Sequence, residues 1–538
     1  MAQLPVPKSS FSVWRYQNRV LTPCFVTRLL GAAALGLCLA ASSLHASAAE
    51  SKPVRVGEGA TILKLRAIAG QNGEAQSVQV RGIERVGRNS DGRLDVHVLY
   101  VHGMGWAERA GLLGDSWHLV RAIEREYGVT GSVMNMARMC PDGSHVGPAP
   151  ADGGLQFTGS ALHGFATDDP HTPVVLGAIA CMDRVVVDLG ERGRISIYRL
   201  LWDNYLYDSA LYPHIGYDDN LFGPYETTRP SALPGTPQPE TYEDLYALRA
   251  RRTAEVKTDM SSYGLSEAAL YLGPYGAHMR KAVAAAACVV ADEAQGLRSP
   301  FADLASKHES LKSTQDAYVG VGVDDACKPE NATHSTLPFA IVTESLGSRV
   351  VFDTFGRDED VKLAQRLGQD ASGEPPEIFM LANQIPVLAP GRLQEAAGTE
   401  ASRVKARLVA LSEINDLLSY ELVPYFEHLY NMRCRPQPEQ FSGSDPQCPT
   451  TGRNEVQMSQ HRALLRDKAA RAELIRQIGF DVVDVRTRFA KAIPGYPEAI
   501  DPAEAHVGYL DQVDLLRLMM CGVSNGRVRT AADGCLAR

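Results

Sequence analysis

Short runs of consecutive apolar residues, each followed by a stretch with helical spacing, constrain the fold of this chain most strongly. A strand with one face in water alternates apolar and polar residues, whereas a strand covered on both faces is apolar throughout. The run FAIV at 339–342 is of the second kind, and helical spacing follows at 346–356. Further strands are expected at 93–101, 377–388, 404–411 and 479–489, and a last helix at 510–520. This alternation predicts an α/β fold with a mostly parallel central sheet flanked by helices.

The rest of the chain fits this pattern less well. Edge strands are expected at 61–68 and 77–86, a helix at 115–128, two strands with a tight turn at 184–202, and helices at about 241–272 and 278–296. A tyrosine-rich stretch at 198–225 and a proline-rich loop interrupt the alternation. We interpret about 140–330 as an insertion whose part at about 198–300 is cap-like and covers a cleft. Alternatively, its aromatic side chains pack only the core of the insertion itself.

The N-terminus has the features of an export signal. Four basic residues and no acidic one precede the apolar run LLGAAALGLCLAA, and Ala46-Ser47-Ala48 has the small-x-small form of a signal-peptidase site. The apolar run is short for an uncleaved membrane anchor. Leu37 is bulky where lipid-attachment sites need a small residue, which disfavours a lipoprotein anchored at Cys38. We therefore expect cleavage near Ala48 and a periplasmic or secreted protein.

Charge and hydropathy limit the partners of the chain. The formal net charge is −9, and removing residues 1–48 with their four basic residues brings it to about −13. An acidic chain without a basic block is not expected to bind nucleic acid. No segment after residue 48 is apolar enough to predict a transmembrane helix. The expected organisation is a signal peptide at 1–48, an extension with edge strands at 49–92, a main domain at 93–522 and a tail at 523–538.

Eight cysteines remain after the signal, an even number in an exported chain, which indicates disulfides. Pairing neighbours in the sequence links Cys434 with Cys448 and Cys521 with Cys535. Loops of that length are worth roughly 3 kcal/mol each in the chain-entropy model. The alternative is that some thiols stay free and buried, above all Cys288, which lies in an alanine-rich helical stretch.

The segment between the strand at 339–342 and its helix contains the sequence Thr-Glu-Ser-Leu-Gly. It resembles the Gly-x-Ser-x-Gly nucleophile elbow, in which a serine occupies a sharp strand-to-helix turn. Such a turn requires small residues on either side of the serine. Gly347 fits this requirement, whereas Thr343 is β-branched and fits only in part. Ser345 is therefore a candidate nucleophile, and Glu344 beside it is expected to point toward solvent.

Three further loops contain residues that a serine nucleophile would need for catalysis. The loop VHGMGW after the strand at 93–101 is similar to the His-Gly-x-Gly loop that follows the third strand of α/β-hydrolases. Together with the elbow, it makes 93–135 and 338–522 resemble the α/β-hydrolase superfamily, whose lipases and esterases are serine hydrolases. The resemblance implies an oxyanion hole formed by the backbone N–H groups of Met104 and Leu346. His102 is expected to have a structural role in its loop.

The same resemblance indicates the acid and the base. The superfamily places its acid after a late strand, where Asp416 and Glu413 both qualify, and we favour Asp416. It places its histidine just before the last helix, where His506 lies between small residues. The order Ser345, Asp416, His506 reproduces the Ser…Asp…His order of this fold.

These residues imply an exported serine hydrolase that cleaves a carboxylic ester, whether small or lipid-like, through an acyl-enzyme on Ser345. The tyrosine-rich segment weakly favours apolar acyl chains. Two alternatives stay open: acyl transfer by the same triad, and a catalytically silent binding protein that keeps the fold. Motifs for calcium, zinc or nucleotides are absent from the sequence, so we expect neither a cofactor nor a metal.

Overall fold

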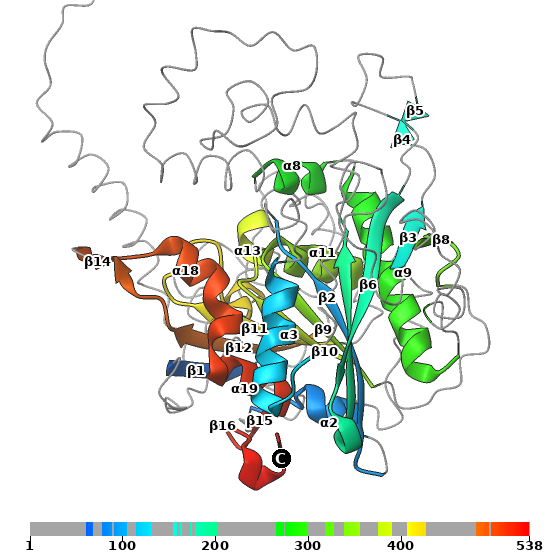
Figure 1. Cartoon of the computed structure of the whole chain (residues 1–538). Helices are drawn as coiled ribbons and strands as arrows, with labels where there is room; N and C mark the ends of the chain where they lie inside the picture. The colour runs from blue at the N-terminus through cyan, green and yellow to red at the C-terminus, as the bar shows by residue number, and fades with distance from the viewer. Residues whose placement is uncertain are drawn as a thin grey trace, which may run out of the picture. The chain divides into compact units, whose positions relative to one another are not determined.

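The fold was examined in a computed structural model of the chain (Figure 1). The structure describes residues 61–67, 78–88, 91–104, 114–131, 154–158, 162–163, 173–174, 178–202, 265–273, 275–297, 301, 318–327, 338–355, 375–389, 406–426, 480–493 and 496–536. The expected signal peptide, the tyrosine-rich stretch after Trp202 and the pair Cys434 and Cys448 lie outside these ranges.

A ten-stranded mixed sheet forms the centre of the described part of the chain. Its order is β1-β12-β11-β10-β9-β2-β7-β6-β3-β8. The strands are β1 (Thr61–Ala67), β2 (Leu94–Val101), β3 (Gly154–Thr158), β6 (Ala178–Asp188), β7 (Gly193–Leu201), β8 (Tyr318–Gly322), β9 (Phe339–Glu344), β10 (Glu377–Leu381), β11 (Ala406–Glu413) and β12 (Phe480–Arg488).

The six strands from β12 to β7 run parallel to one another, and antiparallel pairs occur only toward the two sides of this sheet. Strand β1 pairs antiparallel with β12 at one edge. On the other side, β6 pairs antiparallel with both β7 and β3. The expected α/β class with a mostly parallel sheet is thus confirmed.

Helices cover both faces of the sheet, as the apolar strands require. One face packs against α9 (Gly276–Gln295) and α11 (Leu346–Phe355), with side chains such as Leu99 and Ile341. The other packs against α3 (Gly114–Tyr127) and α19 (Val513–Cys521), with Tyr100 and Val342 among its strand residues. Figure 1 shows α3 and α19 in front of the sheet. Neighbouring strand residues therefore enter different cores, and neither face tolerates polar side chains easily.

Only the first of the two expected N-terminal edge strands forms. Residues 61–67 are strand β1, but the described residues 78–86 of the second expected strand contain a single bridge from Val80 to Val523 and then most of helix α2 (Ile83–Gly87). Gly82 explains the difference, because its φ of 74° ends the extended path. A Cβ there would lie 2.3 Å from the backbone nitrogen of Gly522, so the chain turns where it touches the end of α19.

Much of the expected insertion at about 140–330 belongs to the main sheet. Strands β3, β6, β7 and β8 lie in it, and β7 pairs with the central strand β2. Helix α9 falls within the stretch interpreted as cap-like, yet it packs on the sheet through its alanine-rich surface. Small alanine side chains allow this close approach. Within the supposed cap, the structure also describes 198–202 at the end of β7 and helix α8 (Ser266–Leu272), whereas 203–264 lie outside the described residues.

Two disulfides join described cysteines. Cys521 is bonded to Cys535, as the pairing of sequence neighbours predicts, and this bond ties residues 523–536 to the end of α19. Cys288 is bonded to Cys327, so the expectation of a free thiol at Cys288 is wrong. Helical spacing at an alanine-rich position indicates burial, but it carries no information about the segment that approaches the helix from outside.

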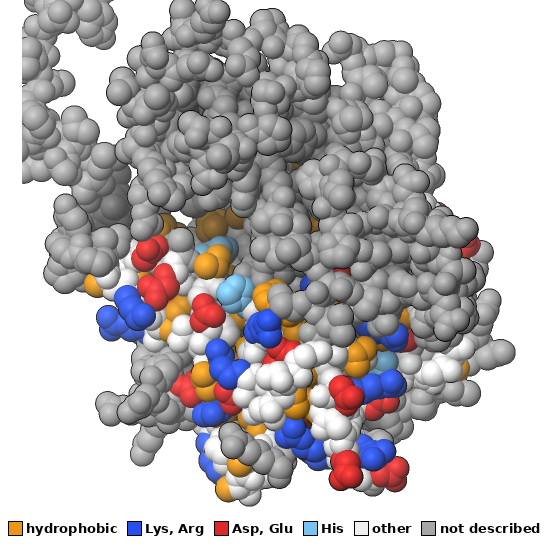
Figure 2. Space-filling view, in the orientation of Figure 1, with side chains coloured by type: hydrophobic (Ala, Val, Ile, Leu, Met, Phe, Trp, Pro, Cys, Tyr) orange, Lys and Arg blue, Asp and Glu red, His pale blue; other side chains and the backbone are white. Residues whose placement is uncertain are grey.

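The described surface drawn in Figure 2 carries interspersed acidic and basic side chains. Ion pairs such as Arg517 with Glu126, 3.0 Å apart, are of this kind. Among the helices in the described ranges, none is both long and apolar enough to cross a bilayer.

We expect the buried His97 to make the protein less stable in acid. Its Nδ1 lies 2.8 Å from the hydroxyl of Tyr198, and burial lowers its pKa from 6.5 to about 4, with Asp95 only partly opposing the effect. The unfolded chain takes up this proton near pH 6.5 and the folded chain only near pH 4. The stability due to neutral His97 is therefore present above pH 6.5 and lost as the pH falls to 4, by about 3 kcal/mol.

Urea unfolding of the wild type, of His97→Gln and of His118→Gln between pH 7 and pH 4 measures this effect. His118 lies exposed on α3 and serves as the control. The His97 variant should lose less stability on acidification than the other two proteins. Equal pH slopes for all three would show that His97 does not contribute.

Candidate active site

Ser345 lies at the sharp turn that joins β9 to α11. Its φ is 49°, in the left-handed region that non-glycine residues rarely adopt, and it is buried. The Ser345 N–H donates a 2.8 Å hydrogen bond to the carbonyl oxygen of Leu381 at the end of the neighbouring strand β10. The strained backbone is thus held by the sheet, as it is at many functional positions.

The small residues around the serine have specific contacts. A Cβ on Gly347 would lie 2.2 Å from the carbonyl oxygen of His102, so α11 passes directly against the loop that follows β2. Thr343 is tolerated because its side chain points to the α11 side, where its hydroxyl lies 2.8 Å from that of Ser348. A threonine therefore satisfies its polar atom here, and no glycine is required at this position.

Glu344 does not face solvent as expected. It is 4% exposed, and its carboxylate accepts a 2.5 Å hydrogen bond from the hydroxyl of Tyr100 on β2. The alternation of a strand explains this placement, because Thr343 turns to the α11 face and Glu344 must then turn to the core that contains Tyr100. Both faces of this sheet are covered, so neither direction leads to water.

His506 meets Ser345 from the other end of the chain. It lies on the short helix α18 (Pro502–Val507), and its Nε2 is 2.9 Å from Ser345 Oγ. Its Nδ1 is 3.0 Å from each carboxylate oxygen of Asp416. Gly508 follows, packed so closely on the ring of Phe489 that a Cβ would lie 2.8 Å from it. That contact directs the path of the chain just after the histidine.

Of the two candidate acids, Asp416 and not Glu413 contacts the histidine. Glu413 ends β11 and turns back, accepting hydrogen bonds from the backbone N–H and the side-chain amide of Asn415. Asp416 lies beyond this turn, and its Oδ1 also accepts a 2.9 Å hydrogen bond from the N–H of Leu418. Glu413 is occupied in shaping the loop, which leaves Asp416 to orient the imidazole.

Tyr509, which the sequence analysis did not single out, forms a hydrogen bond with Asp416. Its hydroxyl donates to Asp416 Oδ2 at 3.2 Å and accepts the backbone N–H of Glu413 at 2.7 Å. Burial, followed by the nearby Asp416 charge, raises the pKa of this hydroxyl well above its ordinary value, so the donor stays protonated. A tyrosine three residues after the histidine is the only sequence signal of this role.

The loop after β2 lies beside Ser345. A Cβ on Gly103 would lie 2.7 Å from the Cβ of Ser345, which places Met104 next to the site. His102 has the structural environment expected of it: Nδ1 lies 2.6 Å from the carbonyl oxygen of Gly103, and its ring stacks on Trp202. The indole N–H of Trp202 also donates to the His102 carbonyl oxygen at 3.0 Å. Met104 follows Gly103 in this loop, and Leu346 follows Ser345 as the first residue of α11.

A fourth side chain at the site was not foreseen. Gln384 lies just after β10, in a segment predicted as continuous strand at 377–388; the strand ends at Leu381 and a short helix, α13 (Ile385–Leu388), follows. Its Nε2 is 2.7 Å from Ser345 Oγ. The signal was present, since Asn383 and Gln384 interrupt an apolar run at the carboxyl end of an inner strand, where α/β sheets place their reactive groups.

No protein-family model, curated protein or solved structure matches this chain. The site must therefore be interpreted from its own geometry. The arrangement can move a proton from a serine hydroxyl to an imidazole whose other nitrogen faces a carboxylate. Within the described ranges, no group of three or more His, Cys, Asp or Glu side chains is placed to hold a metal ion.

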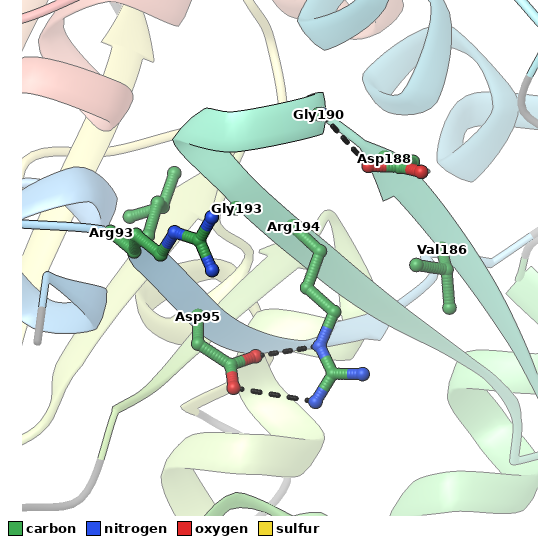
Figure 3. A pocket seen from close by; sticks show the side chains of 8 residues that line it. Arg93, Asp95, Val186, Asp188, Gly190, Gly193 and Arg194 are labelled. Atoms are coloured by element: carbon green, nitrogen blue, oxygen red, sulfur yellow. Dashed lines mark hydrogen bonds and ion pairs between the residues drawn. The ribbon is translucent and has the colours of Figure 1, made fainter.

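A separate surface depression of about 480 Å³ lies at the opposite end of the sheet, around the first residues of β2 and β7. Figure 3 shows how its polar groups are paired: Arg194 forms two hydrogen bonds with Asp95, and the N–H of Gly190 donates to Asp188. Strand β2 leads from this depression to the loop beside Ser345. The depression is thus a different place from the serine site.

Proposed function

We propose that this chain is a serine hydrolase of the α/β-hydrolase type that cleaves carboxylic esters through an acyl-enzyme on Ser345. The observation that carries the proposal is the hydrogen-bonded series from Ser345 Oγ through His506 to Asp416, with the serine at a left-handed strand-to-helix turn. The strand order around β9 supports it, because the serine follows β9 and the acid follows β11, two places away among the parallel strands, while the histidine comes later in the chain than β12.

The proposed mechanism follows from the needs of a serine hydroxyl. His506 Nε2 takes the Oγ proton as Oγ attacks the ester carbonyl carbon, and Asp416 stabilises the imidazolium that forms. The backbone N–H groups of Leu346 and Met104 are the proposed donors to the oxyanion, a contribution that is worth several kcal/mol in such sites. The imidazolium then protonates the leaving alcohol, and a water activated by His506 hydrolyses the acyl-enzyme.

Exposed apolar side chains near the triad support an apolar substrate. Leu417, beside Asp416, is 67% exposed, and Val507, beside His506, is 52% exposed. Val387 on α13 is exposed as well, and so are Ile414 and Tyr420 in the segment after β11. We propose that they contact the acyl or alcohol part of the ester. The two disulfides are compatible with the proposed export to an oxidising compartment.

Covalent labelling tests the proposal. We expect a fluorophosphonate probe to add one label to the native protein, and peptide mapping to place it on Ser345. The Ser345→Ala variant should take up none. A native, folded protein that stays unlabelled would instead favour the alternative of a catalytically silent binding protein.

Acyl transfer is the remaining alternative, and product analysis separates it from hydrolysis. With a p-nitrophenyl ester and a primary alcohol present, a hydrolase should release mainly the free acid. Dominant formation of the new ester would show that the acyl-enzyme prefers an alcohol acceptor to water.

A further inference from the structure

We infer that Gln384 is a further catalytic residue, whose side-chain N–H stabilises negative charge on Ser345 Oγ. The inference rests on the proposed function and adds a donor that belongs neither to the triad nor to the two backbone groups at Met104 and Leu346. It begins from the 2.7 Å separation of Gln384 Nε2 and Ser345 Oγ, in a side chain that is 1% exposed.

The hydrogen-bonding capacity of the serine decides which way the amide faces. Ser345 Oγ carries one proton, and His506 Nε2, 2.9 Å away, must accept that proton for the reaction to begin. Toward Gln384, Oγ can therefore act only as an acceptor. The amide nitrogen and not the amide oxygen must face it. In the resting site, Oγ thus donates to the histidine and accepts from the glutamine.

The backbone around Gln384 is held on both sides. Ala382 has a φ of 51°, the same left-handed conformation as Ser345, and its N–H donates to the carbonyl oxygen of Leu411 on β11. Register pairs Leu381 with Glu344, so the two strained turns leave neighbouring strands at the same level. Strain at two adjacent positions is costly and persists only where the surroundings enforce it.

Side chains on either side of Gln384 complete this support. The amide of Asn383 donates to the carbonyl oxygen of Tyr420 at 2.8 Å. Arg349, on α11, donates from Nη1 to the carbonyl oxygen of Ile385 at 3.1 Å, while its Nε binds Asp353 at 2.9 Å. The loop is therefore tied to the acid loop on one side and to the nucleophile helix on the other, and the glutamine reaches Oγ without having to be ordered first.

The chemical contribution follows from the charge on Oγ during the reaction. As the O–H bond breaks and the proton passes to His506, Oγ becomes negative before its bond to the carbonyl carbon is complete. In deacylation that bond breaks and Oγ carries charge again until His506 returns the proton. Gln384 transfers no proton in either step. The hydrogen bond from its N–H to Oγ is stronger when Oγ is charged than when it is neutral. This difference stabilises the transition state relative to the resting enzyme.

The main test is Gln384→Met, which keeps the length of the side chain and removes the donor. We expect kcat for a p-nitrophenyl ester to fall about 10- to 100-fold with KM changed by less than about threefold, as for loss of a hydrogen bond to a charged atom. The rate constant for fluorophosphonate labelling should fall in parallel, while labelling of Ser345 still goes to completion. Gln156→Met on β3, at a distant strand of the sheet, is the matched control and should leave both rates unchanged.

A second variant, Gln384→Glu, distinguishes electrostatic stabilisation from mere packing. An ionised carboxylate beside Oγ opposes the developing charge, so activity at neutral pH should fall below that of the methionine variant. Protonation of this carboxyl at lower pH restores a donor, so the activity relative to wild type should rise as the pH falls.

The inference is overturned if Gln384→Met keeps kcat within about threefold of wild type, or if its loss appears only in KM. It is also overturned if the Glu variant shows the same pH profile as the Met variant. These results leave the proposed function intact as long as the wild type is labelled at Ser345. An unlabelled wild type would refute the proposed function itself, and the inference with it.

Discussion

Asp416→Asn is expected to lower kcat/KM for a p-nitrophenyl ester about 10⁴-fold. The carboxylate of Asp416 accepts the Nδ1 proton of His506 with both oxygens at 3.0 Å, which leaves Nε2 free to take the proton of Ser345. An asparagine can present its N–H₂ group to Nδ1, which favours the tautomer with the proton on Nε2. That tautomer cannot accept the serine proton, and the imidazolium loses its counter-charge.

Glu413→Gln is the matched control, because Glu413 is the other carboxylate of the same loop. Its carboxylate accepts hydrogen bonds from Asn415, and a glutamine keeps one acceptor oxygen for them. We expect less than about a threefold loss of kcat/KM. If the Gln variant were instead the weaker enzyme and the Asn variant nearly normal, Glu413 would be the functional acid. Thermal unfolding of both variants verifies that each is folded.

Gly347→Ala is expected to lower the free energy of unfolding by about 4 kcal/mol or more, which is among the largest losses caused by single substitutions. The added Cβ would lie 2.2 Å from the carbonyl oxygen of His102 and 2.5 Å from that of Val101. Both atoms are backbone, at the end of central strand β2, so no side-chain rotation relieves the overlap. Helix α11 must move away from the sheet and carry Ser345 out of reach of His506.

Gly320→Ala provides the control for this prediction. Gly320 is on β8, at the edge of the sheet, and nothing lies within 4 Å of a Cβ built on it. Alanine there should be neutral or slightly stabilising, by up to about 1 kcal/mol, because it restricts the unfolded chain. Urea midpoints and soluble yield measure both variants. A Gly347→Ala protein as stable as wild type would show that α11 can separate from the loop after β2.

Several parts of the fold could be predicted because they depend on residues that are close together in the sequence. The apolar run at 339–342 indicates a strand buried on both faces, and the spacing that follows indicates a helix. The small residue at Gly347 marks the sharp turn between them. The order of Ser345, Asp416 and His506 along strands of one sheet predicted that they would meet, and the hydrogen bonds from Oγ to the imidazole and on to the carboxylate show them together.

Other parts depended on contacts between residues that are far apart in the chain, which no local sequence pattern indicates. The strand predicted at 77–86 became helix α2 because Gly82 meets Gly522, more than 400 residues away in the chain. Glu344 was expected in solvent, yet its place in the sheet directs it to Tyr100. The disulfide between Cys288 and Cys327 also depends on which segment folds beside α9.

The sequence by itself determined the class of the fold, because hydrophobic periodicity is a property of residues close together in the chain. It can be recognised without knowing any tertiary contact. The sequence also determined which serine occupies a strained turn. Only the tertiary structure decided what surrounds that hydroxyl: Gln384 on one side, His506 on the other and Tyr509 under the acid. Hydrogen bonds of this kind act over about 3 Å between segments that are distant in the chain, and their geometry exists only after the sheet and both helical layers have packed.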